Sequence, residues 1–133
     1  MDTLVDANVI LDVVTEDSAG AKWSEDALLA AAAAGRLVIN PIVYAEISVA
    51  YERIEDVEAA LLDDVERHPL PWEAGFLAGK LFLRYRRAGG RRRSPLPDFY
   101  IGAHAATAGM TLLTRDAGRY RSYLPRLPII APA

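Results

Sequence analysis

Residues 4–12 read "LVDANVILD", and this stretch decides how the chain begins to fold. Residues 3–6, "TLVD", form a short apolar run suited to a buried strand, and a helix is expected from about Val9. The acidic residue Asp6 nevertheless lies among these apolar neighbours. A carboxylate in such surroundings is costly to desolvate unless it is hydrogen-bonded, paired with a cation or bound to a metal. We therefore expect a compensating group beside Asp6.

Length and composition indicate one globular domain spanning residues 1–133. The chain has 133 residues, of which 52% are hydrophobic, enough for a substantial core. It has no apolar run long enough to cross a bilayer and no basic segment leading into an apolar stretch at its start. We therefore expect a soluble, cytoplasmic protein with no membrane partner. The absence of cysteine excludes both a disulfide framework and a thiolate metal site.

Short apolar runs alternate with longer stretches of helical character along the whole chain. Strands are expected at residues 3–6, 36–40, 110–114 and 127–130. Helices are expected from residue 9 and at 21–34, 41–54, 57–65, 72–87 and 98–108. Parallel strands need crossover connections, so this alternation predicts an α/β fold, with a parallel central sheet flanked by helices on both faces.

Four acidic residues fall where such a sheet gathers ligands. Asp6 ends the first strand, and Asp116 follows the strand "TLLT" by two residues. Glu46 lies in the second turn of a helix after "LVIN", and Asp98 begins another helix. All four can reach the carboxyl edge of the sheet. Two like charges about 4 Å apart repel by roughly 4 kcal/mol at an effective dielectric near 20, so Mg2+ or Mn2+ is the expected compensation.

The motifs that carry these acids resemble those of the PIN-domain nucleases, in the same order along the chain. "LVDANVILD" is similar to the opening motif of that family, and "NPIVYAEI" at 40–47 to its second acidic motif. "LPDFYIGAHAATAGMTLLTRDAGRY" at 96–120 resembles the paired third and fourth motifs. The similarity runs from Asp6 to the closing "LPIIAP". Size and layout most resemble the VapC-type toxins of toxin–antitoxin pairs.

This resemblance implies a PIN-like fold and metal-dependent cleavage of RNA phosphodiester bonds. It carries over four catalytic, metal-binding acids: Asp6, Glu46, Asp98 and Asp116. Mg2+, with Mn2+ as a substitute, would screen the charge of the phosphodiester and lower the pKa of the attacking water. We expect Asp6 and Asp98 to bind metal directly, with Glu46 and Asp116 as ligands or as acceptors that orient water. Asn8 and Thr114 are expected as polar members of the site.

The family also implies a cognate antitoxin and a homodimer as partners. Tyr120 stands where such proteins commonly have phenylalanine, and we interpret it as a packing variation. Asp12 is expected to be a solvated or capping acid. His104, in an alanine-rich helix, is expected to be a satisfied or exposed histidine and not a general base.

Arginines concentrate in "RYRRAGGRRR" at residues 84–93, just before the Asp98 helix. A net charge of −3 argues against a protein that coats nucleic acid through an overall positive surface. A local cluster can still hold RNA phosphates or an acidic antitoxin segment, and a solvated loop is the alternative. The candidate binding residues are Arg84, Arg86, Arg87, Arg91, Arg92, Arg93 and, beyond this cluster, Arg115.

Two other classes of function remain open at this stage. A phosphotransfer or phosphatase-like α/β domain also places Mg2+-binding aspartates at strand ends, although "DAN" at residues 6–8 lacks the second aspartate of a DxD motif. A non-catalytic binding module is the other alternative. Singly, Asp98 and Asp116 could be cap or turn residues and Glu46 a surface acid. Nothing in the sequence identifies which RNA would be cut.

Overall fold

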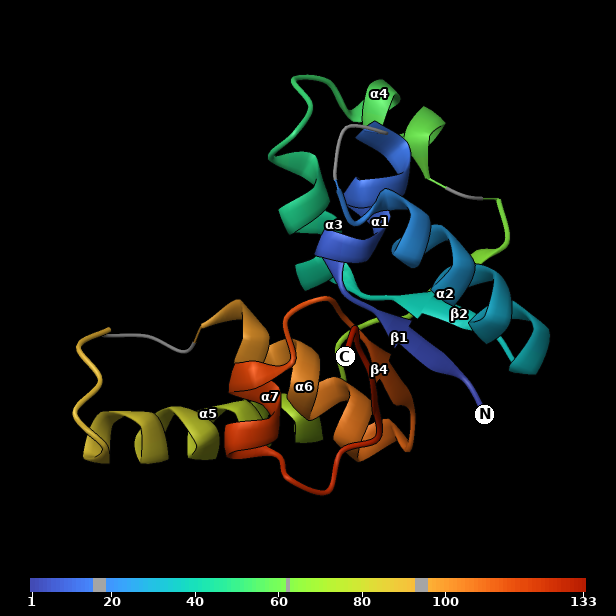
Figure 1. Cartoon of the computed structure of the whole chain (residues 1–133). Coiled ribbons are helices and arrows are strands. Elements are labelled where there is room, and N and C mark those ends of the chain that lie inside the picture. The colour runs from blue at the N-terminus through green and yellow to red at the C-terminus, as the bar shows by residue number, and fades with distance from the viewer. Residues whose placement is uncertain (16–18, 62, 93–95) are drawn as a thin grey trace.

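The fold is built on five short parallel strands. A computed structural model describes residues 1–15, 19–61, 63–92 and 96–133 of the chain (Figure 1). The strands are β1 (Thr3–Val5), β2 (Leu37–Ile39), β3 (Val65–Arg67), β4 (Thr111–Leu113) and β5 (Ile129–Ile130). They form a single sheet in the order β3-β2-β1-β4-β5, with every neighbouring pair parallel. The predicted parallel sheet is confirmed, with β1 at its centre.

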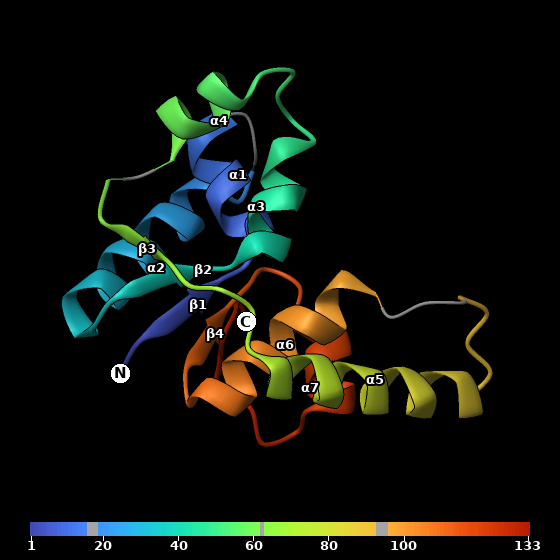
Figure 2. The ribbon, with the colours of Figure 1, turned by 180° about the vertical axis from the view of Figure 1, so that it is seen from behind.

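Helices cover both faces of the sheet, as the alternation of elements predicted. The described part of the chain contains α1 (Ala7–Thr15), α2 (Ala21–Ala34), α3 (Pro41–Ser48), α4 (Ile54–Ala60), α5 (Trp72–Arg87), α6 (Pro97–Ala108) and α7 (Gly118–Tyr123). Helices α1 to α4 lie on one side of the sheet and α5 to α7 on the other, in both the front and the rear view (Figures 1 and 2). Among the described helices, none is long and apolar enough to cross a membrane.

Two clusters of buried residues hold these layers together. The larger joins the strands to α1, α2, α3 and α6, with Leu4 and Leu112 fully buried at its centre. The smaller packs α5 on α6 around Phe99, whose ring makes edge-on contacts with Tyr85 and Tyr123 at centroid distances of 5.7 and 5.3 Å. Beyond these contacts, α5 projects from the body as an arm (Figure 1). The second cluster therefore packs α5 against α6 from Ala74 to Tyr85.

Several boundaries differ from those expected. The helix expected at 41–54 ends at Ser48, whose hydroxyl donates to the Tyr44 carbonyl at 2.7 Å while tighter turns follow at Ala50 and Tyr51. The helix expected at 57–65 is α4, which lies further towards the N-terminus at residues 54–60. Residues 65–67 instead pair with β2, with Val65 opposite Leu37. Strand β3 and helix α7 were not predicted.

The carboxyl ends of the three central strands lie side by side, and each is followed directly by a polar residue. Asp6 follows β1, Asn40 follows β2 and Thr114 follows β4. The Asp6 amide donates to the Leu113 carbonyl at 2.9 Å, which extends the pairing of β1 with β4 by one step. Asn40 caps α3 by accepting from the Val43 amide at 2.9 Å. Polar side chains therefore gather at the carboxyl edge of the central strands.

Candidate active site

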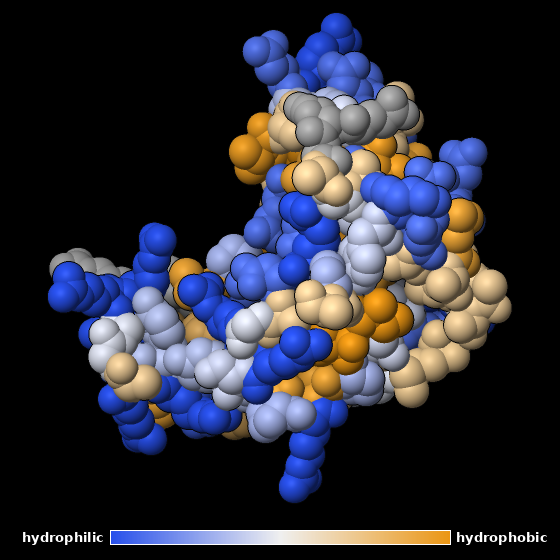
Figure 3. Space-filling view, viewed as in Figure 1, coloured by the Kyte–Doolittle hydropathy of each residue, from blue (hydrophilic) through white to orange (hydrophobic). Residues whose placement is uncertain are grey.

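A pocket of about 320 Å³ opens at this carboxyl edge. All four predicted acids line it: Asp6, Glu46, Asp98 and Asp116. Asn8 and Tyr120 also line it, from α1 and α7. The molecule is hollowed between its upper helices and the α5 arm, and hydrophilic side chains gather along the inner side of this hollow (Figure 3). The fold thus brings together four carboxylates that are distant in the sequence.

Asp6 is compensated by hydrogen-bond donors from three elements. Its Oδ1 accepts from the Ala7 amide at 2.8 Å, and its Oδ2 accepts from Thr114 Oγ1 at 2.9 Å and from the Tyr120 hydroxyl at 3.0 Å. The residue is only 5% exposed. Burial raises the pKa of Asp6, the Thr114 and Tyr120 hydrogen bonds oppose this, and the charge of Asp98 adds to the rise. Charge repulsion at this position is therefore reduced but not removed.

Asn8 and Thr114 form the support beneath Asp6. Thr114 Oγ1 lies 3.4 Å from Asn8 Nδ2 and accepts from the Asp116 amide at 3.1 Å, while donating to Asp6. Asn8 Oδ1 accepts from the Arg115 backbone amide at 3.2 Å. Together these bonds tie the loop after β4 to the start of α1. Both residues hold the site's framework, and their predicted membership of the site agrees with their positions.

Asp98 enters the pocket from the first turn of α6. Its Oδ2 lies 3.5 Å from Arg119 Nη1, and its Oδ1 lies 3.4 Å from the Tyr120 hydroxyl. Burial raises the pKa of Asp98, the Arg119 guanidinium and the Tyr120 hydroxyl oppose it, and Asp116 adds to the rise. Asp116 is exposed. Arg119, which the sequence interpretation missed, therefore supplies a cation on the outer side of the cluster.

Glu46 is the acid without compensation. Its Oε1 is buried and has no hydrogen-bond partner among the described residues. Burial, with the charges of Asp6 and Asp98, raises the pKa of Glu46 to about 7. A buried carboxylate oxygen without a partner is unusual, because its desolvation is then not repaid by any bond. The Glu46 Oε1 atom thus points to a missing cation or proton.

The residues present fit a divalent metal ion by their chemistry. Hard cations such as Mg2+ prefer oxygen ligands, and this pocket offers carboxylates together with one unpartnered oxygen. As they stand, however, no three acidic or histidine side chains in the described part of the chain lie close enough to hold one ion together. The expected joint ligation is therefore not preformed.

Asp12 was expected to be a solvated or capping acid, and that expectation is wrong, because its carboxylate is buried and bonds to two side chains. It is 4% exposed, and its Oδ2 accepts from Ser24 Oγ at 2.7 Å and pairs with Arg115 Nε at 2.7 Å. A partly buried ion pair with a second hydrogen bond is costly to break. Arg115, predicted to bind RNA or antitoxin, is thus committed to joining α1 and α2 to the loop after β4.

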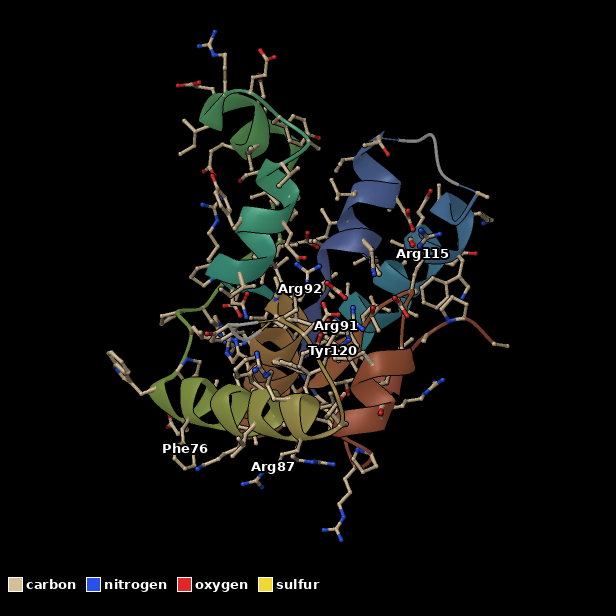
Figure 4. The ribbon with its side chains drawn as sticks, turned by 90° about the vertical axis from the view of Figure 1, so that its left-hand side faces the viewer. Phe76, Arg87, Arg91, Arg92, Arg115 and Tyr120 are labelled. Carbon is tan, nitrogen blue, oxygen red and sulfur yellow. The ribbon has the colours of Figure 1, made fainter. Side chains whose placement is uncertain are left out.

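The candidate binding arginines at residues 84–93 differ in their directions and contacts. Arg91 and Arg92 lie on the same side of α5 as Tyr120 in the side view, whereas Arg87 points the opposite way (Figure 4). Arg84 stacks over the Tyr123 ring and donates to its carbonyl at 3.2 Å, and Arg86 donates to the Arg92 carbonyl at 2.7 Å. Arg93 lies outside the described residues.

His104 is satisfied and buried, as expected. Its Nδ1 lies 3.0 Å from Asn40 Nδ2, and because Asn40 Oδ1 caps α3, the amide nitrogen is the donor. Burial, together with the nearby His68, lowers the pKa of His104. Neither histidine lines the acidic pocket. Both are therefore excluded as groups acting directly at this site.

Interpreting Tyr120 as a packing variation alone is wrong. Its ring is buried at 2% exposure, but its hydroxyl reaches both Asp6 and Asp98. Asp6 and Asp98 are 114 and 22 residues away from Tyr120 in the sequence, so no local pattern indicated these contacts.

Glu46 generates a test of the electrostatics of this site in metal-free protein. Its pKa is about 7 in the fold against 4.5 as the ordinary value, so the folded chain holds this proton more tightly than the unfolded chain. The stabilisation is present below about pH 4.5 and is lost as the pH rises through 7. Glu46→Gln should match the wild type at pH 4 and exceed it at pH 8.5 by roughly 1–3 kcal/mol in urea unfolding.

Glu25→Gln, at an exposed site on α2, is the matched control and should leave the pH dependence unchanged. An equal difference between Glu46→Gln and the wild type at both pH values would contradict this account of Glu46.

Comparison with known proteins agrees with the geometry. A family model described as the PIN domain matches residues 3–123. The fold is similar to VapBC2 from Rickettsia felis bound to a promoter DNA fragment (TM-score 0.78, 19% identity, covering all of both chains). It is also similar to VapBC-1 from nontypeable Haemophilus influenzae (TM-score 0.72, 18% identity, covering 98% of each chain).

A third similar structure is VapC20 from Mycobacterium tuberculosis, a sarcin-ricin loop cleaving toxin (TM-score 0.63, 14% identity, 90% of this chain and 94% of that one). A search of curated proteins returned no match. The family model covers nearly the whole chain and includes all four acids of the pocket. The chain therefore belongs to the PIN domain family.

Proposed function

We propose that this chain is a metal-dependent endoribonuclease, the toxin of a toxin–antitoxin pair, with Mg2+ as its ion and Mn2+ as a substitute. The observation that carries the proposal is the convergence of Asp6, Glu46, Asp98 and Asp116 on one pocket of a PIN domain. Supporting it is the similarity to a structure whose title names a sarcin-ricin loop cleaving toxin. PIN domains generally act with divalent metal ions.

The acids differ in how firmly the fold holds them, and we assign their roles in binding the ion accordingly. Asp6 is fixed by three donors, so it provides the rigid point of the site. Asp98 and Asp116 are less buried and less tightly bonded, which lets them close on a bound ion. The ion, when bound, screens the charge of the phosphodiester and lowers the pKa of the attacking water.

Glu46 is suited to handling the proton of that water. Glu46 lines the pocket, and its Oε1 has no hydrogen-bond partner among the described residues. A carboxylate beside the acids that would hold the ion can act as a general base toward the attacking water. We assign the Glu46 carboxylate to accepting the proton as the water attacks phosphorus. Removal of this acid should therefore impair the chemical step more than substrate binding.

RNA must be attracted to a pocket that is itself negative. Arg91 and Arg92 are exposed and lie on the same side of α5 as Tyr120, beyond the outer end of the arm, so they can contact phosphates of an RNA that extends from the pocket along α5 (Figures 1 and 4). Arg86 braces this segment through the Arg92 carbonyl. We assign Arg91 and Arg92 to phosphate binding, which carries no base specificity.

The partners proposed are a second copy of the chain and a cognate antitoxin. Trp72 and Phe76, one turn apart on α5, are 94% and 70% exposed, and Leu83 on the same face is 41% exposed. Large apolar side chains at such exposure favour an interface. One similar structure is titled a toxin–antitoxin complex and another a member of the VapBC family of toxin–antitoxin systems, which supports an antitoxin partner here.

Cleavage should depend on Asp98 and on a divalent ion. Asp98→Asn removes a charged ligand while keeping its shape, so we expect cleavage of a structured RNA to fall at least about 100-fold. Excess EDTA should abolish cleavage by the wild type, and added Mg2+ or Mn2+ should restore it. The measurement is a gel assay of RNA cleavage with purified protein.

The matched control is Asp26→Asn, at an exposed site on α2 away from the pocket, which should cleave at the wild-type rate. Circular dichroism should show both variants folded. Cleavage by Asp98→Asn at the wild-type rate, or undiminished cleavage in EDTA, would overturn the proposed function. It would leave a binding module or a different chemistry.

Phosphate contacts by Arg91 and Arg92 should appear in the salt dependence of RNA binding. Each neutralised phosphate releases counterions, so Arg91→Gln with Arg92→Gln should weaken binding and reduce the slope of log K against log salt by about 1 to 2. Filter binding in EDTA, which prevents cleavage, measures both quantities. Arg36→Gln with Arg126→Gln, at two exposed sites outside the arginine cluster and the acidic pocket, is the charge-matched control. An unchanged slope in Arg91→Gln with Arg92→Gln would mean that these arginines are solvated and do not contact RNA phosphates.

A further inference from the structure

Tyr120 is held in place by packing around its ring. The ring is almost fully buried and lies against α6 at Gly102. A Cβ atom at Gly102 would stand 3.1 Å from Tyr120 Cδ1 and 3.4 Å from Cε1, so a larger residue there would press on the ring. The Tyr120 hydroxyl therefore cannot withdraw far from the pocket, and only its O–H bond is free to rotate.

The hydroxyl lies between the two acids expected to bind metal directly. Its oxygen is 3.0 Å from Asp6 Oδ2 and 3.4 Å from Asp98 Oδ1. It has one proton, and the shorter distance assigns that proton to Asp6. Asp6 Oδ2 also accepts from Thr114, so both of its lone pairs are occupied. An ion shared by Asp6 and Asp98 would have to compete with the Tyr120 donor.

We propose, on the basis of the proposed function, that Tyr120 is a positioning residue whose hydroxyl substitutes for the metal ion at Asp6 and opposes its binding. The hydroxyl stabilises the metal-free protein by donating to a carboxylate that repels its neighbours. It weakens the ion's hold because that bond must break, by rotation of the O–H, before Asp6 Oδ2 is open to the ion. The Tyr120 hydroxyl thus increases the stability of the metal-free protein and lowers its affinity for the metal ion.

This competition differs from a purely structural role in a measurable way. A structural role would cost Tyr120→Phe the same stability with and without metal. If the hydroxyl competes with the ion, Tyr120→Phe loses stability only in the metal-free protein. When metal is present, the ion binds the folded variant more tightly than the folded wild type and so adds more stability to the variant. A hydrogen bond to a carboxylate is strong enough to change affinity by roughly ten-fold.

The experiment compares chelator-stripped wild type, Tyr120→Phe and Tyr123→Phe, the last removing a hydroxyl from the same helix outside the pocket. Mn2+ binding is measured by calorimetric titration at fixed pH. Thermal unfolding is measured separately, with and without saturating Mn2+. We expect Tyr120→Phe to bind Mn2+ roughly ten-fold more tightly than wild type. Its unfolding midpoint should fall by about 3–6 °C without metal and recover with it. Tyr123→Phe should bind Mn2+ as the wild type does.

The outcomes separate the two proposals. If the wild type binds Mn2+ and Tyr120→Phe binds it equally or more weakly, or loses the same stability in both conditions, the role of Tyr120 is overturned while the proposed function stands. If no variant binds Mn2+, the proposed function fails and this inference with it. Should Tyr120→Phe not fold in metal-free buffer, Tyr120→Met removes the same hydroxyl and must show the same tighter binding.

Discussion

Repulsion among carboxylates at the carboxyl edge of the sheet is the constraint on which the rest of this structure depends. Parallel strands direct their ends to one edge, and β1, β4 and the helices beside them bring four acids there. Such a cluster costs free energy unless donors, protons or cations offset it. Three donors hold Asp6, Arg119 faces Asp98, and Glu46 retains a proton up to about pH 7.

These compensations are unequal, and the inequality leaves acidic oxygens in the pocket that a ligand can reach. Complete pairing of every acid would stabilise the fold but leave no oxygen for an ion or for the proton of an attacking water. The chain instead concentrates hydrogen bonds at Asp6 and its neighbours Asn8 and Thr114, and leaves Glu46 Oε1 without a partner among the described residues. The ion pair of Asp12 with Arg115 anchors the adjoining loop from outside the pocket. Stability is thus given up locally for function, as is usual where pKa values are perturbed.

The sequence predicted the parallel sheet, the helices on both faces and the meeting of the four acids, because apolar runs and strand-end carboxylates are strong local signals. Strand β3 was missed because Val65 is the one apolar residue in a three-residue edge strand. Helix α7 was missed because it is six residues long and begins with Gly118, a poor helix former. The partners of Asp12 and Tyr120 are distant in sequence, so no local pattern could reveal them.

The central claim is that a divalent ion completes this pocket. Anomalous diffraction from crystals grown with Mn2+ tests it most directly, because the signal locates the ion without reference to activity. The account predicts an anomalous peak bounded by the carboxylates of Asp6 and Asp98, within coordination distance of Glu46 or Asp116. Crystals that hold Mn2+ elsewhere on the chain, with this pocket empty at a saturating concentration, would contradict it.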